Sequence, residues 1–188
     1  MKKATILGFA FYLQDQCISV RLANTDLKRW IRLKDLDRTW YSLRGLLYSV
    51  ACISKTFWPR SRSYTDRGKE LRLRYGIPDD SPIQSRKMRN QMDHFDECFQ
   101  KWMKGHPGFS RGGINWGTKS MLPLQNPQLG FLDCPTMTVV FLGKTWMIDS
   151  VVRAVSKLLP EIERDIREIM SRVTSSRSPN HQASHGTG

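Results

Sequence analysis

The chain has 188 residues, 39% of them hydrophobic, and its 30 lysines and arginines against 17 acids leave a formal net charge of +13. This apolar content is enough for one folded domain and excludes a wholly disordered chain. The sequence contains no run of about 20 apolar residues that could span a membrane. The four cysteines form no C-x-x-C pair, which excludes a zinc knuckle and favours buried thiols in a reducing compartment.

The positive charge is the first clue to function. A surplus of this size attracts polyanions, and nucleic acid is the commonest polyanion in cells. Charge alone leaves two alternatives open, which are a basic protein with a solvated surface and a protein that binds an acidic partner. We expect a cytoplasmic protein that does not bind membranes and holds no metal or cofactor.

The first elements are expected to be helical. The segment Ala4–Leu13 follows two lysines as in a signal peptide, but no small-residue cleavage site follows it. Apolar residues recur every three or four positions from Ile6 to Val20, which predicts an opening helix. The residues Asn24-Thr25-Asp26 predict the cap of a new helix.

Two further helices are expected before residue 80. An apolar stripe from Trp40 to Ile53 predicts a core-facing helix, capped by Asp37 or Thr39 and ended by Pro59. The basic segment Tyr64 to Tyr75 predicts the next helix, which Gly76 ends.

The fourth helix is expected to run from Pro82 to Met103, because Asp79-Asp80-Ser81-Pro82 is a strong start signal. At about 100° per residue, the apolar side chains share one arc that should pack inward. They are Met88, Met92, Phe95, Phe99 and Trp102. The polar side chains fall on the other side: Arg86, Arg89, Asn90, Asp93, His94 and Glu97.

The C-terminal third mixes connection, strand and helix. The Gly- and Pro-rich stretch 104–135 predicts a long connection with short turns. Residues 136–143 and 145–148 predict a small β-hairpin that turns at Gly143-Lys144. Asp149-Ser150 predicts the start of a last helix that Pro160 kinks or breaks. We expect one domain over residues 1–173 and a disordered tail over 174–188.

The motif that carries chemistry is Arg89-Asn90-x-x-x-His94. Imidazole can remove the proton of a ribose 2′-hydroxyl near neutral pH, so that the oxygen attacks the adjacent phosphorus. A guanidinium can bind the phosphate oxygens and stabilise the charge that grows on them. Asn90 would orient the ring, and Asp93 or Glu97 would orient a protonated His94 or anchor Arg89. Only RNA supplies this internal nucleophile.

A basic stretch leads into this motif. Residues 53–90 hold ten lysines and arginines against four acids. This surplus predicts a surface that guides phosphates toward the motif. The residues that we expect to bind RNA there are Arg67, Arg72, Arg74, Arg86 and Lys87.

The sequence resembles a bacterial group of HEPN-like proteins over roughly residues 40–103. The resemblance is carried by A-C-I-S-K at 51–55 with Trp58, R-G-K-E-L-R at 67–72, S-P-I at 81–83, and R-K-M-R-N at 86–90 with H-F-D-E at 94–97. It continues more loosely through F-L-D at 131–133 and V-V-F-L-G at 139–143. The HEPN motif is an Arg, a following polar residue that is often Asn, and a His after four to six residues, which Arg89, Asn90 and His94 match.

The resemblance implies a fold and an activity. HEPN proteins are up-and-down helical bundles, commonly dimeric, and many are metal-independent ribonucleases of toxin–antitoxin, abortive-infection and CRISPR-linked systems. A dimer would bring two copies of the motif into one cleft. Asp96 stands where some relatives carry a tyrosine that an antitoxin modifies, so this regulation is not expected. Cys98 stands where the group has an arginine.

The sequence therefore predicts a mainly α, HEPN-like up-and-down bundle with a small β-hairpin before the C-terminal helix. Its predicted function is a metal-independent endoribonuclease in phage defence or toxicity. The expected partners are RNA, a second copy of the chain, and an antitoxin or defence complex. One alternative is a non-catalytic helical module that binds nucleic acid or protein. Another is a structural or regulatory subunit of a larger complex.

Overall fold

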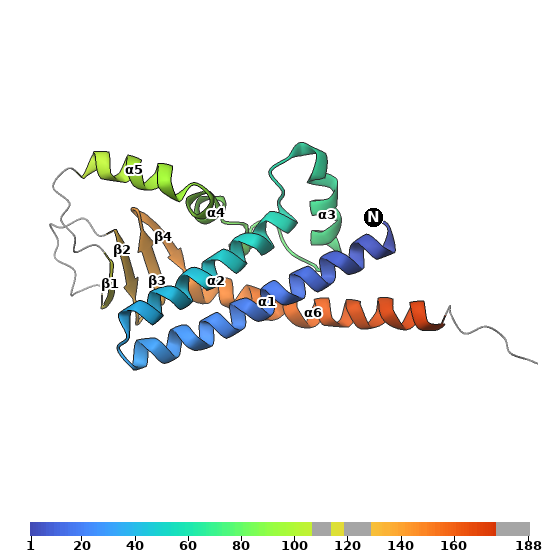
Figure 1. The fold of residues 1–188 in the computed structure, drawn as a ribbon. Helices are drawn as coiled ribbons and strands as arrows, with labels where there is room; N and C mark the ends of the chain where they lie inside the picture. Colours follow the sequence, from blue (N-terminus) through green and yellow to red (C-terminus); the bar gives the residue numbers. More distant parts are fainter. Residues whose placement is uncertain (107–113, 119–128, 176–188) are drawn as a thin grey trace, which may run out of the picture.

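The computed structural model describes residues 1–106, 114–118 and 129–175, apart from the side chains of Arg86, Lys87, Arg89, Met92, Ile114 and Ser175 (Figure 1). Three long helices form the bundle: α1 (Lys3–Arg32), α2 (Leu36–Phe57) and α6 (Ile148–Ser175). Helix α1 packs against both of the others. The fold is thus mainly helical, as the sequence predicts, and no described helix is long and apolar enough to cross a membrane.

Helices α1 and α2 form an antiparallel hairpin. Helix α1 continues through Asn24-Thr25-Asp26, so the predicted helix start at these residues is wrong. The apolar spacing runs on to Leu27, which is fully buried, and the Thr25 hydroxyl donates to the Arg21 carbonyl instead of capping a helix. The cap of α2 is Asp35, whose carboxylate accepts the Arg38 amide at 3.0 Å, and not Asp37 or Thr39.

Helix α3 (Thr65–Arg74) follows a short 3₁₀ turn, η1 (Arg62–Tyr64), and lies across the C-terminal end of α2. As predicted, α2 ends before Pro59 and α3 ends before Gly76, whose φ of 61° suits glycine. A Cβ at Gly68 would lie 2.5 Å from the Phe57 carbonyl oxygen and 2.6 Å from Pro59 Cδ. Only glycine therefore lets α3 approach the end of α2 this closely.

The predicted helix over 82–103 is divided into three pieces. These are the 3₁₀ turn η2 (Pro82–Gln84), α4 (Arg86–Asp93) and α5 (Phe95–Gly105), with a non-helical His94 (φ −122°, ψ 46°) between the last two. Helix α4 packs on α2, whereas α5 stacks Phe95 on Phe141 of the sheet with ring centroids 5.9 Å apart. Because the helix is interrupted at His94, positions before and after it do not follow one continuous progression of about 100° per residue. The prediction of one inward apolar arc is therefore wrong at Phe95, which is 43% exposed, and right at Met88 and Trp102, which are buried.

A four-stranded sheet precedes α6, with the order β1 (Ile114–Gly117), β2 (Gly130–Asp133), β3 (Thr138–Phe141) and β4 (Lys144–Met147). Strands β1 and β2 are parallel, and the other pairs are antiparallel. The predicted hairpin is confirmed as β3–β4, but its two-residue turn lies at Leu142 and Gly143, which both have positive φ, and not at Gly143-Lys144, because Lys144 pairs with Phe141 in the ladder. Strands β1 and β2 lie in the stretch predicted to be a connection, and this prediction is wrong where they form.

The sheet closes one end of the bundle beside the α1–α2 loop (Figure 1). Trp40 of α2 packs on it, with its ring centroid 6.2 Å from that of Phe141, and Gly130 leaves room for the indole. Leu132, Val139 and Trp146 join the buried core of the helices. Sheet and bundle therefore share one hydrophobic core.

Helix α6 runs unbroken through Pro160, which contradicts the predicted break there. Buried Leu158, Leu159 and Ile162 keep the helix packed on both sides of the proline. The helix ends at Ser175, two residues beyond the predicted domain boundary at 173, and the rest of the predicted disordered tail lies outside the described residues.

Candidate active site

His94 stands at the corner between α4 and α5. Its amide donates to the Asn90 carbonyl at 3.0 Å, which completes the last turn of α4, and its own carbonyl accepts the Cys98 amide at the start of α5. The imidazole is 41% exposed. The helix break thus places the predicted catalytic ring at the protein surface and outside a continuous helix face.

Two charged groups lie beside this ring. The guanidinium Nη1 of Arg60 is 3.4 Å from His94 Nε2, and Oε1 of Glu97 is 3.7 Å from His94 Nδ1. We call these three residues, Arg60, His94 and Glu97, the His94 corner. A carboxylate on one ring nitrogen and a guanidinium near the other is an arrangement that suits proton transfer beside a bound phosphate.

Helix α4 is held in place by the residues on its inner side. Met88 is 1% exposed, and the Gln91 side-chain amide donates to the Phe141 carbonyl at 2.7 Å. On the outer side, Lys55 Nζ lies 2.6 Å from Asp93 Oδ1 and ties α4 to α2. These contacts fix the position of the His94 corner relative to the bundle.

Some residues of the predicted catalytic group have other partners in the structure than the motif suggested. Asn90 contributes its carbonyl to the His94 amide, and its side chain is exposed. Asp93 pairs with Lys55, while Glu97 is the carboxylate next to the ring. Arg89 lies on α4, but its side chain is outside the described part of the chain, so the predicted Arg89–His94 pairing has no described geometry.

The predicted RNA-binding residues fall into two groups. Arg86 and Lys87 lie on the first turn of α4, and their side chains are not described. Arg67, Arg72 and Arg74 lie on α3, and all three make contacts within the fold. The Arg67 guanidinium lies over the rings of Phe9 and Tyr64, 4.9 Å from each centroid.

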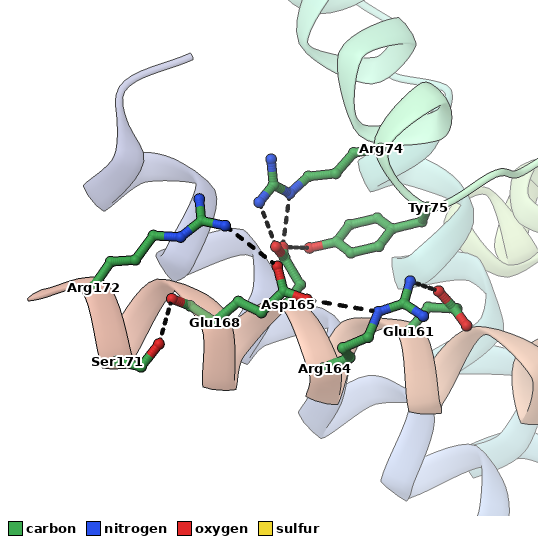
Figure 2. Close-up of polar contacts among 8 residues, drawn as sticks. All are labelled: Arg74, Tyr75, Glu161, Arg164, Asp165, Glu168, Ser171 and Arg172. Atoms are coloured by element: carbon green, nitrogen blue, oxygen red, sulfur yellow. Dashed lines mark hydrogen bonds and ion pairs between the residues drawn. The ribbon is translucent and has the colours of Figure 1, made fainter.

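Arg72 and Arg74 connect α3 to other helices. Arg72 donates to the Phe57 carbonyl at the end of α2 and pairs with Asp79 at 3.1 Å. Figure 2 shows Arg74 and Tyr75 converging on Asp165 of α6, and the Tyr75 hydroxyl donates to Asp165 Oδ2 at 3.0 Å. We call Arg74, Tyr75 and Asp165 the Asp165 clamp.

The Asp165 clamp changes the acidity of its members. Burial by itself would raise the pKa of Asp165, but hydrogen bonds from Arg74 and Tyr75, with the Arg74 charge, outweigh burial and lower the pKa of this carboxyl. Burial and the Asp165 carboxylate together raise the pKa of Tyr75 well above its ordinary value. The clamp is therefore an ion pair that favours the charged carboxylate.

Sequence reasoning missed Arg60 and Lys55 as neighbours of the motif. Both belong to the predicted basic stretch, and Lys55 also ends the segment A-C-I-S-K of the resemblance, but neither signal placed them beside His94. Arg60 is 34 residues from His94, and only the turn of the chain after Pro59 brings them together. Lys55 reaches Asp93 because α4 packs along α2.

The described residues form neither a disulfide nor a cluster of three metal ligands. Cys17 and Cys52 are buried as predicted for thiols, whereas Cys98 and Cys134 are half-buried, and all four are free. Burial, with the nearby Glu163 carboxylate, raises the pKa of Cys17 to about 12. Within residues 1–106, 114–118 and 129–175, no three His, Cys, Asp or Glu side chains gather in a way that could hold a metal ion.

Comparisons of this chain with protein-family models, with curated proteins and with solved structures gave no match. The relation to HEPN proteins therefore stays a prediction from the motif and its surroundings.

Proposed function

We propose that this protein is a metal-independent endoribonuclease of the HEPN type, acting in phage defence or as a toxin. The observation that supports this function best is the His94 corner, where an exposed imidazole lies between the Arg60 guanidinium and the Glu97 carboxylate. These groups match the needs of RNA cleavage by 2′-hydroxyl attack.

The reaction needs a base, an acid and a cation. The imidazole of His94 takes the proton of a ribose 2′-hydroxyl, and the oxygen forms a bond to the adjacent phosphorus. The bond to the 5′-oxygen breaks, and this oxygen receives a proton. The products carry a 2′,3′-cyclic phosphate and a 5′-hydroxyl, so atoms and charge balance without an added reactant.

Each neighbouring residue has a distinct role in the proposal. Arg60 and Arg89 bind the phosphate and stabilise its growing negative charge. Glu97, whose Oε1 lies 3.7 Å from Nδ1, orients the imidazole, a role that the motif offered to this carboxylate as well as to Asn90. In a homodimer, the His94 side chains of the two copies would take the base and acid roles at one composite cleft.

The test is cleavage of a mixed RNA pool in excess EDTA. We expect wild-type protein to cleave RNA and leave 2′,3′-cyclic phosphate ends, and to leave DNA intact. His94→Ala and Arg89→Ala should abolish cleavage, and Arg60→Ala should weaken it. Size-exclusion chromatography with light scattering gives the number of copies in solution.

Matched controls come from the same elements. His106 ends α5, with Nδ1 2.8 Å from the Trp102 carbonyl, and Arg62 lies two residues beyond Arg60. His106→Ala and Arg62→Ala should retain cleavage. If no RNA is cleaved but RNA binding is salt-sensitive, the protein is a non-catalytic binding module. Cleavage that survives His94→Ala also contradicts the proposal.

A further inference from the structure

An exposed line of side chains runs along α2. Tyr41, Tyr48 and Lys55 follow one another at intervals of seven residues, and each interval rotates the position by about 20° around the helix, so Tyr41 and Lys55 lie about 40° apart. Each step along the axis is about 10 Å. Tyr41 is 81% exposed and Tyr48 is 61% exposed, whereas most other side chains of α2 are buried.

A fourth member gives this line a positive charge between its rings. Arg44 is exposed and lies three residues after Tyr41 and four before Tyr48, so it is a neighbour of both on the helix surface. We call Tyr41, Arg44, Tyr48 and Lys55 the tyrosine stripe. The acidic residue Asp37 lies at its far end, in the first turn of α2.

Tyr12 of α1 widens the stripe at its middle. Its ring is 41% exposed, and it lies near Cys52 and Tyr48 of α2. Burial, together with Cys52 and Tyr48, raises the pKa of Tyr12 to about 12.

The stripe leads to the candidate active site. Lys55, its last member, contacts Asp93, the residue before His94. Helix α2 ends at Phe57, and Arg60 lies three residues further on beside the imidazole. Rings and cations thus alternate along one helix up to the groups proposed to cleave RNA.

We propose that the tyrosine stripe, with Tyr12, binds single-stranded RNA by base stacking and guides it to His94. Tyrosine rings stack on the faces of unpaired bases, which a duplex hides, while Arg44 attracts the phosphates between them. The chain's net charge of +13 suits this polyanion better than a basic or apolar partner. The inference rests on the proposed function for the direction of the strand but has its own test.

The test measures binding apart from cleavage. The His94→Ala protein is titrated against a fluorescently labelled single-stranded oligouridylate and against an RNA duplex of equal length. Adding Tyr41→Ala or Tyr48→Ala should weaken single-strand binding by about five- to a hundredfold each, the range that loss of one stacked base gives. Duplex binding should change little.

Further variants separate the ring from the hydroxyl and from charge. Tyr41→Phe and Tyr48→Phe should bind as the parent does, because stacking needs only the ring. Arg44→Ala should lower the slope of log affinity against log salt by about one, whereas the tyrosine variants should leave it unchanged. Tyr64→Ala is the matched control, since Tyr64 is 54% exposed and lies on η1 rather than on α2.

The outcomes distinguish this inference from the nuclease. Unchanged single-strand affinity in both Tyr→Ala variants, with wild-type unfolding midpoints, overturns the stripe even if wild-type protein cleaves RNA. The same unchanged affinity with a shift from dimer to monomer assigns the stripe to a second copy of the chain and also overturns it. If RNA binding depends on the tyrosine stripe but no RNA is cleaved, the proposed binding surface is supported and the proposed nuclease activity is contradicted.

Discussion

Arginine has opposite roles at the end of α3, where Arg74 lies, and in the connection from α2 to α3, where Arg60 lies. In the Asp165 clamp, Arg74 binds a carboxylate whose side chain is only 11% exposed and which also accepts the Tyr75 hydroxyl. In the His94 corner, Arg60 lies beside an imidazole whose carboxylate neighbour, Glu97, is 76% exposed. The first arrangement satisfies its charges within the protein, whereas the second leaves them open to a ligand.

This contrast shows why a basic stretch is a poor map of a binding surface. Residues 53–90 hold ten cations, yet Arg72 and Arg74 stabilise helix ends. Arg72 is itself only 14% exposed and donates to a backbone carbonyl, and Arg74 pairs with a carboxylate that is 11% exposed, so both arginines are engaged within the fold.

The largest expected effects are a loss of stability in the Asp165 clamp and a loss of cleavage in the His94 corner. Asp165→Ala leaves Arg74 and Tyr75 without their shared acceptor and should lower the free energy of unfolding by about 2–3 kcal/mol, with cleavage retained below the unfolding transition. His94→Ala should lower cleavage by about a hundredfold or more and leave unfolding nearly unchanged. Urea denaturation measures the unfolding free energy of each variant, and single-turnover kinetics measure its cleavage rate. If both variants lost stability and cleavage to the same extent, the two regions would not differ in role.

Gly68→Ala should affect both regions, because a Cβ there meets the Phe57 carbonyl and Pro59. We expect a loss of about 1–3 kcal/mol in the free energy of unfolding from the clash, and weaker cleavage because Pro59 precedes Arg60. The control is Gly8→Ala, since nothing lies within 4 Å of a Cβ at that position. Wild-type stability in the Gly68 variant would show that α3 can shift without cost.

Acid should weaken the clamp selectively. The pKa of Asp165 is lowered in the folded protein, so its ionised form adds stability above the unfolded-state pKa of about 3.9, and this stability is lost as the pH falls through the folded value. The difference in unfolding free energy between wild type and Asp165→Asn should therefore shrink from pH 5 toward pH 2. Urea titrations across this range measure it, and a constant difference would contradict the ion pair.

The smallest effect is expected at Glu97. An exposed ion pair contributes about 0.2–1 kcal/mol, so Glu97→Gln should slow cleavage by about two- to fivefold and barely alter unfolding. The loss should diminish at high salt, because exposed charges are screened. A loss as large as that of His94→Ala would instead make Glu97 indispensable to proton transfer.

Local patterns predicted the elements whose signals agree with one another. The apolar stripe of α2, its end before Pro59, the glycine after α3 and the β3–β4 hairpin all follow from spacing and turn residues. Predictions failed where a local signal competed with packing. The capping residues Asn24-Thr25-Asp26 lie inside α1, and Pro160 lies inside α6, because each helix buries apolar residues on both sides of the signal.

The sequence by itself determined a basic, mainly helical domain and the identity of the residues in the R-N-x-x-x-H motif, because composition and periodicity are local properties. Only the tertiary structure decided what surrounds His94. The helix breaks at His94, between α4, which packs on α2, and Phe95, which stacks on Phe141, and the chain after Pro59 brings Arg60 to the ring. Contacts between residues 34 apart depend on how whole helices pack, which no spacing within one segment encodes.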